Sequence, residues 1–446
     1  MPSESRRTTR ISIALPRILT IPLMMIPPFL AGSSANEAQT VAHDQNQTLR
    51  NEVRAAHAGG DAQAYLKQSR KLFEFLNGSP NSILQVMSAE AFAGDEASAL
   101  NSFERFIQMG QSNERVLQAT QFDAIRKSPR FLSLKREMAT NTKRVSRASE
   151  VIRMPDVGMV PEDIDFDRRT RRFYVTSVIN KEIMSFDLTG HFRRFARAPD
   201  SWPMMAIKVD SHRRILWATE VAIQGFASVS KSDWGTSAVL IYDLDSGKMI
   251  DRIPGPPRST LGDMALTKDG DAIVSDNDEG VLYRLHWKSH SFERLDATNF
   301  VTPQTAAVSS DGRYVFVPDY LRGIGVVDLS TKQVSWLNSE GVHALSGIDG
   351  LYIYDGTLIA TQNGTSPERV VRFSLDQSLM HVKSELVIER STSSLGDPTH
   401  GVIVNGAFYY IANSGWDTLE DDGRPKVGSK PSGALLMCVD LRAKLK

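Results

Sequence analysis

The sequence contains almost no cysteine and carries no net charge. Cys438 is the only cysteine among 446 residues, so a disulfide cannot form within the chain. Lysine plus arginine number 52, and so do aspartate plus glutamate, so electrostatics give no reason to expect nucleic acid or an anionic membrane as a partner. Hydrophobic residues make up 41% of the chain, which is enough to build two domains by burial alone.

Apolar runs are short apart from one near the N-terminus. Arg6, Arg7 and Arg10 precede a mostly apolar stretch at residues 18–30, and small residues follow it. This order is typical of an export signal. The stretch is too short and too rich in proline to form a regular membrane-spanning helix. We therefore expect a signal peptide over residues 1–35 and a periplasmic or secreted protein, with an uncleaved membrane anchor as the alternative.

An apolar strand that runs into a turn ending in leucine recurs six times in the rest of the chain. The intervals between these leucines are 56, 41, 44, 46 and 66 residues, and the leucines are Leu188, Leu244, Leu285, Leu329, Leu375 and Leu441. A period of about 40 to 50 residues, filled with short β-patterned runs, is the signature of four-stranded propeller blades. The sequence therefore predicts a mainly β fold with a six-bladed β-propeller over residues 148–446. Residues 151–154 can supply the fourth strand that the last blade lacks.

The segment ahead of the propeller, residues 36–147, has a helical period. Two helices are predicted between Pro80 and Gly110, with a break at Gly94 and Asp95. This pair resembles one tetratricopeptide unit, which would make the segment a tetratricopeptide-like helical domain. Such a domain is either an arm that binds a protein partner or a cap that packs on the propeller, because a binding groove needs more repeats than one.

Two sets of polar side chains are expected around one central mouth of the propeller. Strands alternate in direction, so the starts of the inner strands and the ends of the second strands lie on the same face. The first set is Glu162, Asp263, Gln304, Asp349 and His400. The second set comprises Ser177, Glu220, Asp276, Asn277, Asp319, Gln362, Asn363 and Asn413. Of these, Glu220, Asp276, Asp319, Asn363 and Asn413 are expected to line a substrate site. Two long loops reach this face, and their Trp234 and Trp416 either line a pocket or anchor the loops.

Crowded carboxylates at this mouth need a counter-charge. Like charges in a confined site repel one another, so protons or a cation must neutralise them. Oxygen ligands favour a hard divalent metal, with Ca²⁺ first and Mg²⁺ or Mn²⁺ as alternatives; the candidate ligands are Glu162, Asp263, Gln304 and Asp349. His400 is a base, a ligand or a hydrogen-bonded structural residue.

Several motifs of the propeller are similar to those of a known family. The chain reads Pro-Glu-Asp-Ile at 161–164, Gly-Asp-Met-Ala at 262–265 and Ile-Asp-Gly-Leu at 348–351. These motifs resemble the senescence marker protein and gluconolactonase family of six-bladed propellers. The resemblance implies one divalent metal that serves lactone hydrolysis, with Glu162 and Asp349 at matching ligand positions. Asp263 and Gln304 stand where that family has asparagines.

Two functions remain open at this point. The first is a metal-dependent hydrolase that acts on a small-molecule lactone or sugar acid ester, with Asp349 and His400 as catalytic candidates. The second is a non-catalytic binding or scaffold propeller that holds a partner at the mouth or the helical arm. A redox quinoprotein is disfavoured because such propellers have more blades and a richer tryptophan repeat than the six scattered tryptophans of this chain.

Overall fold

A computed structural model describes residues 42–430 and 432–443. The predicted signal peptide, residues 1–35, lies outside the described residues. Among the helices that are described, none is both long and apolar enough to cross a membrane.

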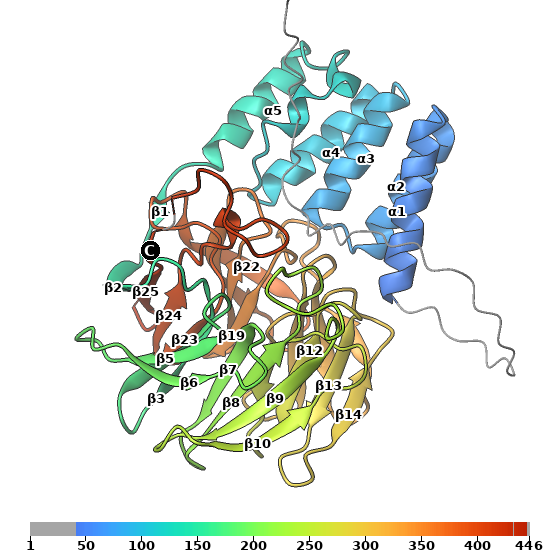
Figure 1. Ribbon diagram of the computed structural model, residues 1–446. Helices are drawn as coiled ribbons and strands as arrows, with labels where there is room; N and C mark the ends of the chain where they lie inside the picture. Colours follow the sequence, from blue (N-terminus) through green and yellow to red (C-terminus); the bar gives the residue numbers. More distant parts are fainter. Residues whose placement is uncertain (1–41, 431, 444–446) are drawn as a thin grey trace, which may run out of the picture. The chain divides into compact units, whose positions relative to one another are not determined.

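Six antiparallel sheets form the β part of the chain, and each has at least four strands (Figure 1). The first sheet contains β3(Pro161–Asp167), β4(Arg172–Ser177), β5(Glu182–Phe186) and β6(Arg193–Arg197). The second contains β7(Met204–Asp210), β8(Ile215–Val221), β9(Ser237–Asp243) and β10(Met249–Pro254). The third contains β11(Leu261–Leu266), β12(Ala272–Asp276), β13(Val281–Leu285) and β14(Phe292–Asp296). The fourth and fifth are β15(Ala307–Val308), β16(Tyr314–Asp319), β17(Gly323–Asp328) and β18(Val334–Trp336); and β19(Gly350–Tyr354), β20(Thr357–Gln362), β21(Arg369–Leu375) and β22(Val382–Arg390), joined by β1(Val145–Ser146). The predicted six-bladed, mainly β propeller is confirmed.

The sixth sheet closes the ring with strands from both ends of the propeller. It contains β23(Gly401–Val404), β24(Ala407–Ile411), β25(Leu435–Asp440) and, as its outer strand, β2(Ser149–Arg153). β2 pairs antiparallel with β25, and Ser149 lies opposite Cys438. The prediction that residues near 151–154 complete the last blade is therefore confirmed, and the pairing covers an edge that would otherwise be open.

The propeller core consists of six hydrophobic clusters, each shared between two neighbouring blades. One cluster joins Tyr174 and Ile183 of the first blade to Leu216 and Leu240 of the second. The corresponding clusters join the second and third, third and fourth, fourth and fifth, fifth and sixth, and sixth and first blades. Because every blade buries one face against each neighbour, the ring positions the inner strands rigidly around its axis.

The segment before the propeller contains five α-helices in the described part of the chain. They are α1(Ala42–Ala58), α2(Ala62–Phe75), α3(Pro80–Phe92), α4(Glu96–Gln108) and α5(Pro129–Thr140). Asp61 and Asp95 cap α2 and α4, because each side chain accepts a hydrogen bond from a backbone N–H of the first turn. α3 and α4 match the two predicted helices, and the break falls at Gly94, whose φ is +77°. The resemblance to a tetratricopeptide unit stays a prediction.

The helices contact loops of the fourth and fifth blades on the face where the inner strands begin. Arg322, which lies just after the end of β16, donates through Nε to the carbonyl oxygen of Phe75 at 3.0 Å. Ser366, between β20 and β21, donates through Oγ to the carbonyl oxygen of Ser112 at 2.6 Å, and its N–H donates to Oε1 of Gln111. The helical segment therefore packs on the propeller as the cap interpretation expects. The protein-binding interpretation is not tested by these contacts.

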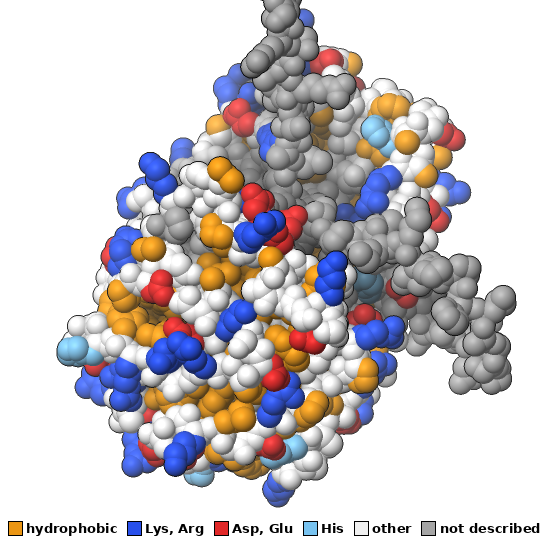
Figure 2. Space-filling model, in the orientation of Figure 1, with side chains coloured by type: hydrophobic (Ala, Val, Ile, Leu, Met, Phe, Trp, Pro, Cys, Tyr) orange, Lys and Arg blue, Asp and Glu red, His pale blue; other side chains and the backbone are white. Residues whose placement is uncertain are grey.

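Charged side chains are mixed on the visible surface. On the face drawn in Figure 2, Lys and Arg side chains lie among Asp and Glu side chains, and no broad area carries a single sign. This agrees with the formal charge of zero. Any electrostatic recognition must therefore be local to a site.

Candidate functional site

The inner strands of four blades bring four buried ionisable side chains to the central mouth. Glu162 lies on β3 and Asp263 on β11, while Asp349 and His400 directly precede β19 and β23. Their exposed fractions are 8%, 4%, 7% and 1%, respectively. The pairings β3 with β4 and β11 with β12 shift register at this end, and such bulges re-aim the side chains at the start of a strand. We call these four residues the mouth cluster.

His400 is held by two hydrogen bonds that fix its protonation. Its Nδ1 lies 2.8 Å from the carbonyl oxygen of Glu162, and its Nε2 lies 2.8 Å from Oδ1 of Asp263. A carbonyl oxygen only accepts, so Nδ1 carries a proton, and a carboxylate opposite Nε2 favours a second one. Burial lowers the pKa of His400, but Asp349 and the hydrogen bond to Asp263 outweigh it and raise this pKa well above its usual value. His400 is therefore a buried imidazolium.

Asp263 is the counter-ion of His400 and is fully hydrogen-bonded. Thr305 Oγ1 donates to its Oδ1 at 2.6 Å, and Asn277 Nδ2 donates to its Oδ2 at 2.7 Å. Burial raises the pKa of Asp263, but the hydrogen bonds from His400, Thr305 and Asn277 outweigh it and keep this pKa below its usual value. Gly262 makes room for this network, because a Cβ at that position would lie 1.9 Å from Oδ1 of Asn277.

Glu162 and Asp349 are like charges with one hydrogen bond each. Trp416 Nε1 donates to Oε2 of Glu162 at 2.5 Å, and Asn363 Nδ2 donates to Oδ2 of Asp349 at 3.0 Å. Burial, and then the neighbouring Asp349, raise the pKa of Glu162 well above its usual value. Burial raises the pKa of Asp349 to about 7. Within the described residues, the second carboxylate oxygen of each side chain receives no hydrogen bond.

The mouth cluster has an excess of negative charge that suits a divalent cation. When all are ionised, the three carboxylates of Glu162, Asp263 and Asp349 face the single positive charge of His400, which leaves two negative charges. Ligand atoms of Glu162, Asp349 and His400 lie within 4.8 Å of one another. His400 is a poor ligand while both nitrogens carry protons, and both oxygens of Asp263 are occupied. The donor set therefore fits a hard cation bound by the two free oxygens of Glu162 and Asp349.

Two side chains of the predicted substrate-lining set reach the mouth cluster. Asn363 bonds to Asp349, and Trp416 bonds to Glu162, as described above. Trp234 and Trp416 both pack in a hydrophobic cluster that includes Phe226, but the buried indole nitrogen of Trp234 has no hydrogen-bond partner among the described residues. Trp416 is therefore placed to act at the mouth, whereas the contacts of Trp234 are those of a loop anchor.

The remaining predicted residues bind nearby groups outside the mouth cluster instead. Gln304 donates its amide to Thr302 Oγ1 at 3.0 Å. The other four accept backbone N–H groups: Glu220 from Asp200, Asp276 from Thr260, Asp319 from Val301 and Asn413 from Leu435, the first residue of β25. No hydrogen bond within the described residues links these five side chains to the mouth cluster.

The position one residue further along the chain carries the polar groups that do reach the mouth. Asn277 follows Asp276 and bonds to Asp263, whereas Tyr320 follows Asp319 and donates its hydroxyl to Asn363 at 3.0 Å. Side chains alternate across a strand, so a shift of one residue exchanges the two faces. Asn277 is one of the residues predicted at the mouth, whereas Tyr320 is not. A polar residue directly after the strand-terminal acid is the signal that marks both positions.

The two long loops pack against each other beside the mouth. The rings of Phe226 and Trp416 lie 6.2 Å apart, and Ala227 N–H donates to the carbonyl oxygen of Asp422 at 2.9 Å. Val160, which precedes β3, belongs to the same hydrophobic cluster. This packing fixes the Trp416 indole against Glu162.

Comparisons with known proteins are limited to similar folds. No protein-family profile matches the chain, and no curated protein matches it. A streptogramin B lyase structure matches with 12% identity and a TM-score of 0.45, over 65% of this chain and 96% of that one. A PQQ-bound aldose sugar dehydrogenase from Streptomyces coelicolor matches with 12% identity and a TM-score of 0.44, over 66% and 99%. A gluconolactonase from Xanthomonas campestris matches with 12% identity and a TM-score of 0.44, over 66% and 94%. At these values the likenesses carry no argument about function.

Proposed function

We propose that this propeller is a metal-dependent hydrolase of the gluconolactonase type, which opens a lactone or small ester at its central mouth. The observation that supports the proposal is the charge of the mouth cluster. Three buried carboxylates face one imidazolium, and two of them, Glu162 and Asp349, keep an oxygen free for a ligand. A divalent cation bound there would supply charge neutralisation, polarisation of a carbonyl oxygen and a lowered pKa of water.

Each residue of the cluster has a distinct part in this proposal. Glu162 and Asp349 would hold the cation through their free oxygens, and Asp349 would accept a proton from the attacking water. The water oxygen would bond to the carbonyl carbon while one of its protons passes to Asp349. The ring C–O bond would then break, and Asp349 would return this proton to the leaving oxygen. The products are one hydroxyl group and one carboxylic acid, which ionises in water. His400 orients Glu162 and Asp263 rather than acting as a base, because both of its nitrogens are engaged.

Trp416 orients the Glu162 carboxylate from one side of the mouth, and Asn363 orients Asp349 from another. The same proposal includes three further points. Ca²⁺ is the first candidate for the metal, the substrate is a small molecule, and the protein is exported to the periplasm or outside the cell. A protein partner on the helical arm belongs to the alternative, a non-catalytic binding propeller.

The test is metal content and calcium affinity, measured by elemental analysis and calorimetry on the purified protein. We expect one divalent ion per chain and at least a hundredfold weaker calcium binding in Glu162→Gln, together with loss of aldonolactone hydrolysis. Glu52→Gln, an exposed position on α1, is the matched control and should behave as the wild type. Absence of bound metal and of turnover in the wild type would reject the hydrolase in favour of the binding propeller.

A further inference from the structure

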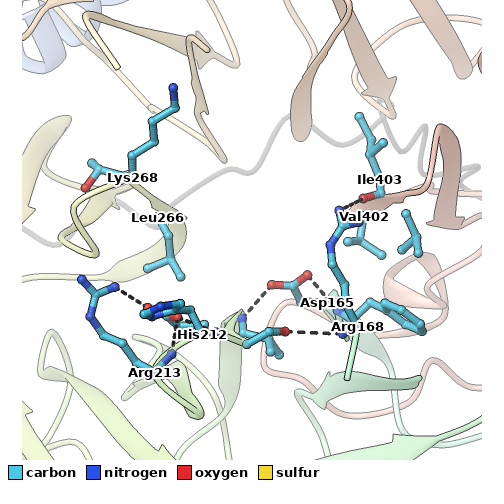
Figure 3. Close-up of a pocket in the computed structure, with 14 residues that line it drawn as sticks. Asp165, Arg168, His212, Arg213, Leu266, Lys268, Val402 and Ile403 are labelled. Carbon is cyan, nitrogen blue, oxygen red and sulfur yellow. Dashed lines mark hydrogen bonds and ion pairs between the residues drawn. The ribbon is translucent and has the colours of Figure 1, made fainter. Parts of the chain in front are cut away.

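A second pocket opens at the other end of the inner strands. It is formed where β3, β7, β11 and β23 end, whereas the mouth cluster lies where these strands begin. Its volume is about 570 Å³, which is in the range of small-molecule sites. Figure 3 shows Leu266 and Val402 among the side chains that surround the hollow. We call it the basal pocket.

The rim of the basal pocket carries basic side chains without acidic partners. Arg168 donates to Oδ1 of Asn405 at 3.2 Å and to the carbonyl oxygen of Ile403 at 3.3 Å. Lys268 donates to the carbonyl oxygen of Ser310. Neutral oxygens leave both positive charges uncompensated, because neither cation forms an ion pair with an acid in the described ranges. This arrangement favours an anion above the pocket.

The acids near the pocket are already engaged. Asp210 forms an ion pair with Arg213 at 2.6 Å. Asp165 accepts the N–H groups of Phe166 and Val209 at 2.7 Å each, and burial raises its pKa to about 6. Figure 3 shows both of these hydrogen bonds of Asp165. Arg168 and Lys268 therefore remain the charges available to a ligand, with the exposed His212 beside them.

The walls between these charges are apolar. Val209, Leu266, Val402 and Val404 line the pocket together with the basic rim. An inorganic anion would satisfy only the rim, whereas a carboxylate on a short apolar body would contact both rim and walls. We propose that the basal pocket binds a small organic carboxylate. The charge there is opposite to that of the mouth cluster, so the inference does not rest on the proposed hydrolase activity.

Three probes separate charge from apolar contact: phenylacetate, 2-phenylethanol with the same body but no charge, and inorganic phosphate with charge but no apolar body. Binding is measured by calorimetry at fixed ionic strength on the full chain. We expect saturable 1:1 binding of phenylacetate and at least tenfold weaker binding of the other two. The proposal is overturned if phenylacetate does not bind, or if either of the other probes binds as tightly.

Variants locate the site. The double variant Arg168→Gln and Lys268→Gln should weaken phenylacetate binding at least tenfold, while Lys248→Gln, an exposed lysine on the turn before β10, should leave it unchanged. Thermal unfolding of each variant checks that the fold is kept. Glu162→Gln should retain phenylacetate affinity, so failure at the mouth and failure at the basal pocket are distinguishable. Unchanged affinity in a folded double variant would overturn the assignment to this pocket.

Discussion

Replacing Asp263 by asparagine should destabilise the protein much more than the same change at Asp349. Among the residues that the structure describes, Asp263 is the only anion that bonds directly to the His400 imidazolium, and it also accepts hydrogen bonds from Thr305 and Asn277. An asparagine there brings its own amide donor against the amide of Asn277 and removes the counter-ion. Breaking a buried ion pair on one side costs about 3 to 5 kcal/mol.

Asp349→Asn should act in the opposite direction above neutral pH. Burial raises the pKa of Asp349 to about 7 from a usual value of 3.8. Between these two pH values the folded chain binds more protons than the unfolded chain, so stability falls as pH rises through the window. A difference of about three pKa units corresponds to about 4 kcal/mol, which is the upper limit of the gain at pH 9. The amide can still accept the hydrogen bond from Asn363.

The assay is thermal unfolding at pH 9 with a chelator present, which keeps cations out of the mouth. Unfolding entropies of about 2.1 cal/mol/K per residue convert 3 to 5 kcal/mol into a melting point about 4 to 6 °C lower for Asp263→Asn. Asp349→Asn should melt at or above the wild-type temperature. Asp355→Asn is the control, because Asp355 is exposed and its φ of +47° suits asparagine. Equal losses for Asp263→Asn and Asp349→Asn would refute the ion-pair assignment.

Two further variants test the surroundings of the mouth. Trp416→Phe removes the hydrogen bond that lowers the pKa of Glu162, so protons should compete better with calcium for this carboxylate. Calcium affinity should therefore fall more at pH 6 than at pH 9. An unchanged pH profile of calcium affinity would show that Trp416 only anchors its loop. Gln111→Ala removes the acceptor of the N–H of Ser366, which lies three residues after Asn363. This variant should lower kcat for lactone hydrolysis several-fold, while its melting point stays within about 3 °C of the wild type. Wild-type kcat in that variant would separate the helical segment from the mouth.

The fold could be predicted from the sequence because blades repeat. The leucines at the ends of the third strands fixed the number of blades, and turns such as Lys268-Asp269-Gly270 marked where strands reverse. The closing strand followed from the missing fourth strand of the last blade. These features depend on local patterns and on the need to cover an edge, and both are visible in the chain.

The candidate site could be predicted only in part, because side-chain direction at strand ends depends on register. The alternating strand direction predicts Glu162 and Asp349 at the mouth, and the family-like motifs match both residues, but the bulge before Ile164 cannot be seen in the sequence. Polar residues that end second strands were expected at the mouth. In the structure Asp276 and Asp319 bind backbone amides. The predicted Asn277 and Asn363 do reach the mouth, and so does Tyr320, which the sequence did not indicate.

The pairing of β2 with β25 has a consequence for how the protein is made. Glu162 lies on β3, just after β2, and His400 directly precedes β23 of the sixth sheet. The hydrogen bond between them spans 238 positions of the chain. A chain emerging from the ribosome can fold its helices and its first five blades while β25 is still unsynthesised, but it cannot bring His400 to Glu162. The mouth is therefore completed only after synthesis reaches the C-terminal strand, so a truncated product would lack it however many blades it had folded.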